Sequence, residues 1–345
     1  MSQQRTRLSR LGMALGALTI VAGIAVGRAE ITLGALAASW LFFAGLAAGG
    51  VAFSAGMRVA QGGWAAEILP VAEAAGAFLG PAFAILVVLV GGARLWMPGL
   101  AAQSTGTWLA LAARDLLAMA ALLVAARSYL RSARVDAKAA MRDAIVYLVV
   151  YVLALTTFAI DLVMGLHDGA PSTVLPPFYF VGAFLGAVAW SALVTSRGRA
   201  ELELPPEGAR VSLATLLFGL AMLWFYLFWS GFLPVWYANL PEETGLILAR
   251  WRGNYRAISV VVIAAIFALP FLLLVPSAAK RRPRRVALAA GSVLVGLVGE
   301  RFLLVLPLLD AHGTWPAVAA LGVTCGLLGA FLVSAGDARG APAVG

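Results

Sequence analysis

Ten apolar runs, each long enough to cross a lipid bilayer, dominate the sequence. A helix needs about 20 mainly apolar residues to span the hydrocarbon core. Only 12% of the residues are charged, against about 25% in soluble domains. The chain is therefore predicted to be an all-α integral membrane protein of about ten transmembrane helices. The predicted spans cover about residues 11–27, 32–57, 68–92, 107–127, 144–166, 177–196, 212–237, 255–276, 286–308 and 315–335.

The first run follows Arg5, Arg7 and Arg10 and has the general form of a signal peptide. Its 17 residues exceed the usual apolar core of a signal peptide, and 25–27 (Ala-Val-Gly) makes a poor cleavage site. We therefore expect the first run to be retained as a span.

The basic residues indicate an orientation. With ten spans alternating from an inside N-terminus, 18 of the 25 lysines and arginines fall inside and five fall outside. Positive residues gather on the cytoplasmic side of membrane proteins. The net charge of +9 therefore indicates topology and does not indicate nucleic-acid binding. The sequence predicts a multi-pass protein of the bacterial inner membrane with both termini in the cytoplasm. His167, His312 and the 238–254 loop are then expected outside.

Short loops between the spans favour antiparallel neighbours. We expect a peripheral helix in residues 1–31, a four-helix bundle in 32–166, a second four-helix bundle in 167–308, and a last helix with its tail in 309–345.

The chain lacks the ligand patterns of redox subunits. It has two histidines, both predicted in or beside outer loops, and one cysteine, Cys325. Haem within a membrane bundle is held by histidine pairs and iron–sulfur clusters by cysteine groups. The sequence therefore offers no candidate catalytic, cofactor-binding or metal-ligating residues.

Six charged residues lie inside the predicted spans, away from their ends, where each costs roughly 2.5–3.5 kcal/mol and needs a partner or a function. They are Glu73, Arg114, Asp115, Asp161, Glu300 and Arg301.

A polar stripe is predicted along the fifth span. At 100° per residue, Tyr147, Tyr151, Thr157 and Asp161 share one face of that helix. The stripe fits either a proton path or a set of hydrogen bonds between helices. Arg114, at a similar depth, is the expected partner of Asp161 or Asp115, and an ion pair favours anchoring over proton relay.

The remaining buried charges also allow two interpretations. Glu73 stands alone in the inner half of the third span, where it is a candidate for proton uptake or a residue reaching to the interface. Glu300 and Arg301 are neighbours on one helix, and neighbours point about 100° apart. We expect each to meet a different helix in a static charge network.

The seventh span ends in an aromatic-rich segment that runs into WYANLPEET at residues 236–244. Tryptophan and tyrosine are typical of the headgroup level of a membrane. Pro234 is expected to kink or end the helix. Pro241 followed by two acidic residues indicates a new helix start, with Arg250 available to pair with those acids.

This segment closely resembles the WYANIPEET signature of the ActF membrane subunits of bacterial alternative complex III. The residues that carry the resemblance are Trp236, Tyr237, Asn239, Pro241, Glu242 and Glu243. The stretch around Trp40, Gly49-Gly50 and Glu73 is similar to the wider NrfD/polysulfide reductase membrane-subunit superfamily.

The resemblance implies two four-helix bundles in a respiratory complex that oxidises quinol and reduces cytochrome c or an oxidase. It also implies a subunit without a cofactor of its own, for which proton translocation is proposed and quinone contact is often stated. Expected partners are an ActC-like sister subunit, an iron–sulfur subunit and a multihaem cytochrome c. Alternatives from the residues are a membrane anchor of a molybdopterin reductase and a secondary transporter.

Overall fold

The computed structural model describes residues 3–166, 172–196, 204–239, 241–309 and 313–340, and within them every regular element is a helix. Ten helical segments are long and apolar enough to cross a membrane, which confirms the predicted all-α class and span number. The spans are α1 (Gln3–Ala25), α2 (Ala29–Val59), α3 and α4 (Leu69–Ala75, Leu79–Gly91), α7 (Thr105–Val135), α8 (Ala137–Leu162), α9 (Leu175–Ser196), α10 (Glu207–Ala238), α12 and α13 (Gly253–Ile263, Leu269–Leu274), α15 (Pro283–Val305) and α16 (Trp315–Gly340).

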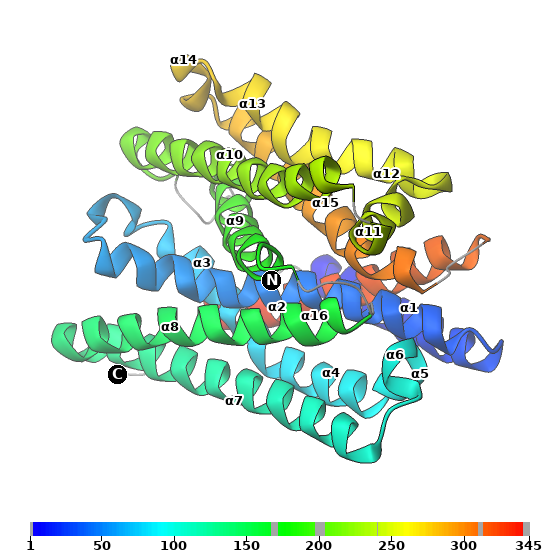
Figure 1. Cartoon of the computed structure of the whole chain (residues 1–345). Helices are drawn as coiled ribbons and strands as arrows, with labels where there is room; N and C mark the ends of the chain where they lie inside the picture. Colours follow the sequence, from blue (N-terminus) through cyan, green and yellow to red (C-terminus); the bar gives the residue numbers. More distant parts are fainter. Residues whose placement is uncertain (1–2, 167–171, 197–203, 240, 310–312, 341–345) are drawn as a thin grey trace.

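The connections gather at two ends of the bundle (Figure 1). We call the end that holds the 59–69, 135–137 and 274–283 connections the basic end, at the left of Figure 1. The opposite end carries α5 (Ala93–Trp96), α6 (Pro98–Ala101) and α11 (Pro241–Trp251), whereas α14 (Ser277–Lys280) lies at the basic end. Short 3₁₀ turns cover Gly63–Ala65, Met164–Leu166 and Leu306–Leu308.

Prolines explain two interruptions within spans. A proline lacks the N–H that would bond the carbonyl four residues earlier. Pro81 falls four residues after Ala77, and the helix narrows to a 3₁₀ turn at Gly76–Phe78. Pro270 falls four residues after Ile266, and the helix widens to a π turn at Ala264–Ala268.

Of the two outcomes predicted at Pro234, a kink or a helix end, the helix end is not observed. Helix α10 continues through Pro234 to Ala238. It stops where Asn239 adopts the left-handed conformation with φ 50°, a common helix ending because asparagine tolerates positive φ. Helix α11 then begins at Pro241, as predicted from its sequence.

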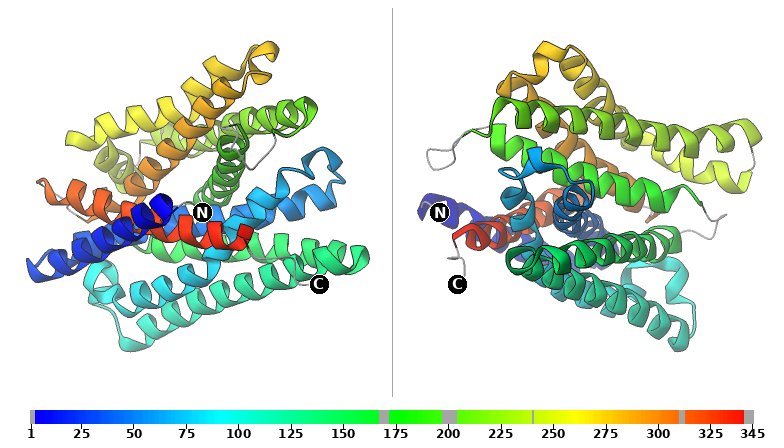
Figure 2. Two further views of the ribbon diagram at one scale, coloured as in Figure 1. Left: turned by 180° about the vertical axis from the view of Figure 1, so that it is seen from behind. Right: turned by 90° about the vertical axis from the view of Figure 1, so that its left-hand side faces the viewer.

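Helix α2 lies at the centre of the molecule, and all residues from Ile31 to Ala55 are buried. It contacts α3, α4, α8, α9, α15 and α16 (Figures 1 and 2). Small residues allow this close packing. A Cβ atom added at Gly49 would lie 2.5 Å from the Ala183 carbonyl oxygen of α9, and one at Gly50 would collide with the Ala72 carbonyl of α3.

The two terminal helices, α1 and α16, pack side by side along the outside of the bundle (Figure 2). Their contact places Gly12 and Gly16 against Gly322 and Gly326, so that backbone meets backbone. Such small-xxx-small spacing is typical of tight helix pairs in membranes. The two predicted peripheral helices therefore form one pair, while the division of the core into two four-helix bundles stays a prediction.

Gly326→Ala is expected to destabilise the protein, because the new Cβ would lie 2.8 Å from the Gly16 Cα atom. Overpacking of this kind costs about 1–3 kcal/mol. Gly219→Ala is the matched control, since a Cβ at that α10 position has no atom within 4 Å. Thermal unfolding in detergent measures both variants, and equal melting temperatures would contradict the importance of the contact.

Candidate functional site

A cavity of about 730 Å³ opens between the helices toward the end opposite the basic end. Residues of α7, α8, α9, α10, α11, α12 and α15 line it. Its wall is mainly apolar and includes the Trp224 ring, which stacks on Phe228 (centroids 5.9 Å apart) and contacts the tilted Phe178 ring (5.3 Å). Four charged side chains also reach it, from Arg114, Asp161, Arg250 and Glu300.

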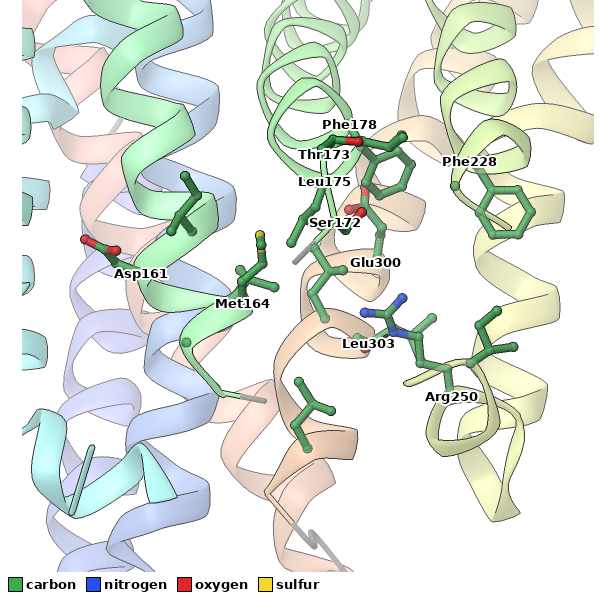
Figure 3. Close-up of a pocket in the computed structure, with 18 of the residues that line it drawn as sticks. Asp161, Met164, Ser172, Thr173, Leu175, Phe178, Phe228, Arg250, Glu300 and Leu303 are labelled. Atoms are coloured by element: carbon green, nitrogen blue, oxygen red, sulfur yellow. Dashed lines mark hydrogen bonds between the residues drawn. The ribbon is translucent and has the colours of Figure 1, made fainter. Parts of the chain in front are cut away.

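Arg114 of α7 and Asp161 of α8 form a two-point ion pair, with Nε and Nη2 each donating to one carboxylate oxygen. The predicted partnership is confirmed. Asp161 is almost fully buried, whereas the Arg114 side chain is 58% exposed. In Figure 3 the Asp161 carboxylate points away from Glu300. The pair therefore joins α7 to α8 at one edge of the cavity.

Asp115 is fully buried next to this pair. Among the described residues, neither of its carboxylate oxygens accepts a hydrogen bond. A buried polar group without a partner costs free energy. The predicted charge network thus places Arg114 in an ion pair with Asp161 and Asp115 beside the same Asp161 carboxylate.

Glu300 and Arg301 form a direct ion pair on α15, with Arg301 Nη1 2.6 Å from Glu300 Oε1. The expectation that these neighbours do not pair was wrong. Their Cα–Cβ bonds diverge, yet both side chains are long enough to curve back toward each other. The expected contacts with other helices also exist: Trp224 Nε1 of α10 donates to Glu300 Oε2 (3.2 Å), and Arg301 Nη2 donates to the Tyr179 carbonyl of α9 (3.3 Å).

Arg250 approaches the same carboxylate from α11. Figure 3 shows its guanidinium turned toward Glu300 and Leu303, and Nε donates to the Leu303 carbonyl (3.1 Å). Burial lowers the pKa of Arg250 and the Glu300 charge raises it, with burial the larger effect, but a guanidinium stays charged in proteins. The sequence suggested that Arg250 pairs with the acidic residues of α11 itself. The residues near Arg250 in the chain gave no sign that its side chain lines this cavity.

Near the basic end, Glu73 has partners that the sequence did not reveal. Ser54 Oγ of α2 donates to Glu73 Oε1 (2.6 Å), and the Tyr129 hydroxyl of α7 lies 2.8 Å from the same Ser54 oxygen. Because the Ser54 proton goes to the carboxylate, Tyr129 donates to Ser54. Glu73 also lines a second cavity of about 570 Å³.

Tyr147 and Tyr151 connect this cluster to the middle of the bundle. The rings of Tyr129, Tyr147 and Tyr151 follow one another with 6.4 Å between successive centroids. The Tyr147 hydroxyl donates to the Ala48 carbonyl (2.8 Å), and Tyr151 donates to the Phe180 carbonyl (2.6 Å), next to Tyr179. We call the series Glu73, Ser54, Tyr129, Tyr147, Tyr151, Tyr179, Arg301 and Glu300 the polar line.

The other end of the predicted stripe takes a different direction. The Thr157 hydroxyl donates to the Leu153 carbonyl of its own helix (3.0 Å), and Asp161 is held by Arg114. The stripe predicted on one helix face is thus divided between the polar line, which Tyr147 and Tyr151 join, and the Arg114–Asp161 pair.

The WYANLPEET segment, residues 236–244, lies at the connection between α10 and α11. The side chains of Trp236 and Tyr237 are 63% and 85% exposed in the isolated chain, and Asn239 caps α10. Pro241, Glu242 and Glu243 open α11, but their side chains lie outside the described part of the structure, as do His167 and His312.

No protein-family model matches the chain, and no curated protein matches it significantly. The fold and the cavities therefore carry the functional argument, and they describe a multi-pass integral membrane protein with charged groups enclosed among its helices.

Glu300→Gln is expected to cost about 3–5 kcal/mol of stability, because it leaves the buried Arg301 guanidinium without a counter-ion. Adding Arg301→Met should recover part of that loss. Glu207→Gln, in the exposed Glu207–Arg281 pair, is the control and should cost less than about 1 kcal/mol. Unfolding free energies in mixed micelles test this, and a double variant as unstable as the sum of both single variants would contradict the coupling.

Proposed function

We propose that this chain is a membrane subunit of a quinol:electron-acceptor oxidoreductase of the alternative complex III type, and that it conducts protons. The observation that carries the proposal is the polar line. It leads from Glu73, which lines the cavity at the basic end, to Glu300, which lines the large cavity near the other end. Buried polar groups in spans are costly and mark ion or proton routes in many membrane proteins.

The route is proposed to begin at Glu73. A proton on Glu73 exchanges through the Ser54 hydroxyl, which contacts both Glu73 and Tyr129, since a hydroxyl both donates and accepts. Beyond Tyr129, the hydroxyls of Tyr147 and Tyr151 donate to backbone carbonyls. Transfer over that segment requires hydroxyl rotation and intervening water. With the basic end in the cytoplasm, as the positive residues indicate, the route leads outward.

Glu300 is the proposed exchange point at the large cavity. Arg301 and Trp224 hold its two oxygens, so the carboxylate has a fixed position in the wall. The Arg114–Asp161 pair is proposed as an anchor of the cavity edge, because a two-point ion pair stabilises the charged carboxylate.

A second role, quinol contact, is favoured by the lining of the same cavity. The aromatic rings of Phe178, Trp224 and Phe228 suit the flat face of a quinol ring, and Glu300 supplies a hydrogen-bond acceptor beside them. A quinol releases two electrons and two protons on oxidation. The chain's own contribution is to hold the ring against the aromatic wall and to place Glu300 where a proton is released.

The composition of the purified complex tests the assignment. We expect the chain to copurify with haem- and iron-containing subunits and with quinol oxidation activity, because its sequence offers no ligand set of its own. Spectroscopy and elemental analysis of the complex measure this. Molybdenum without haem would indicate a reductase anchor, and a lone chain that accumulates substrate in liposomes would indicate a transporter.

Glu73→Gln and Tyr147→Phe are expected to lower proton translocation at least tenfold per electron transferred, because each removes an exchangeable proton from the route. Tyr226→Phe is the matched control, since Tyr226 of α10 is 64% exposed and lies outside the polar line. Proton release and acceptor reduction are recorded together on the complex in liposomes. Unchanged proton-to-electron ratios in both route variants would contradict the proposal.

A further inference from the structure

The cavity at the basic end has an apolar wall and a basic rim. It covers about 570 Å³ between α3, α4 and α7, and Val71, Leu79, Leu123 and Leu130 contribute to its wall. Arg127 and Arg134 line it as well. A site with this lining suits a ligand that has both a hydrocarbon part and a negatively charged part.

The two arginines lie on the same face of α7. Seven residues make nearly two full turns, so Arg127 and Arg134 are separated by about 10 Å along the helix and by only about 20° around it. Neither guanidinium takes part in an ion pair with any described residue. Glu73, the acidic residue in the lining, accepts its hydrogen bond from Ser54. Both guanidinium groups are therefore available to an external anion.

The depth of the site matches the headgroup region. Helix α7 has 31 residues, about 46 Å at 1.5 Å per residue, against about 30 Å for the hydrocarbon core. Its last turn, with Arg134 one residue before the end at Val135, extends beyond the hydrocarbon core, and the long side chain of Arg127, about two turns earlier, can reach toward the headgroups. Leu123 lies one turn deeper, at the level of acyl chains.

We propose that this cavity binds an anionic phospholipid, with the phosphate between Arg127 and Arg134 and an acyl chain against Leu79 and Leu123. Basic pockets between transmembrane helices on the cytoplasmic side are known to suit such headgroups. An inorganic phosphate ion has the negative charge that the arginines require, but it has no hydrocarbon part to contact the apolar wall. An acidic peptide lacks the chain that this wall accepts at membrane depth. The site does not depend on the proposed proton route.

Native mass spectrometry of the full chain in detergent tests the site with phosphatidylglycerol, phosphatidylcholine of the same acyl chains, and inorganic phosphate as competitor. The chain is expected to retain phosphatidylglycerol preferentially. Arg127→Gln and Arg134→Gln should each weaken that binding about fivefold, and the double variant about 25-fold, because each basic residue near a lipid surface contributes about that factor.

Arg131→Gln is the matched control, since Arg131 is exposed on the same helical turns but does not line the cavity. Leu123→Trp, which fills the apolar wall without changing charge, should also weaken lipid retention and serves if the double arginine variant fails to fold. Equal binding of both lipids, an equal loss in Arg131→Gln, or full displacement by phosphate alone would each overturn the proposal. Proton translocation is not part of this measurement, so the two proposals fail separately.

Discussion

Hydrocarbon offers no hydrogen-bond partner, so the polar side chains within the spans of this protein depend on other helices to satisfy them. Arg114 joins α7 to Asp161 on α8. Glu300 and Arg301 join α15 to Trp224 on α10 and to the Tyr179 carbonyl on α9. Each such contact removes a polar group from lipid and also fixes which helices are neighbours. The polar contacts therefore specify which helices are neighbours, and the small residues allow those helices to pack closely.

Close packing and charge placement depend on each other at α9. A Cβ atom at Gly182 would lie 2.8 Å from the Arg301 Nη2 atom, so the absence of a side chain there makes room for the guanidinium. The same guanidinium lies 4.5 Å above the Tyr179 ring, a cation–π contact that is strongest away from water. The glycine, the tyrosine and the arginine form one packed unit in the interior.

The sequence predicted the spans and a pair of Arg114 with either Asp161 or Asp115, because hydropathy is local and depth follows from span boundaries. It did not predict Ser54, Tyr129 or Trp224 as partners of buried acids, since a serine or an aromatic residue in an apolar run has no local mark of its tertiary contact. The Glu300–Arg301 pair was missed because helical angles describe Cβ directions and not the reach of long side chains. At Pro234 the sequence predicted a kink or a helix end, and α10 continues four residues further, to Ala238.

The central position of α2 has a consequence for biosynthesis. Residues Ile31 to Ala55 are shielded on all sides in the finished molecule, yet α15 and α16, which cover part of that surface, follow far later in the chain. A newly inserted α2 must therefore contact lipid or other helices until α15 and α16 have been synthesised. Membrane insertion and final assembly are thus separate events for this helix. In a nascent chain that ends before Trp315, the face of α2 that packs against α16 would be exposed to the bilayer.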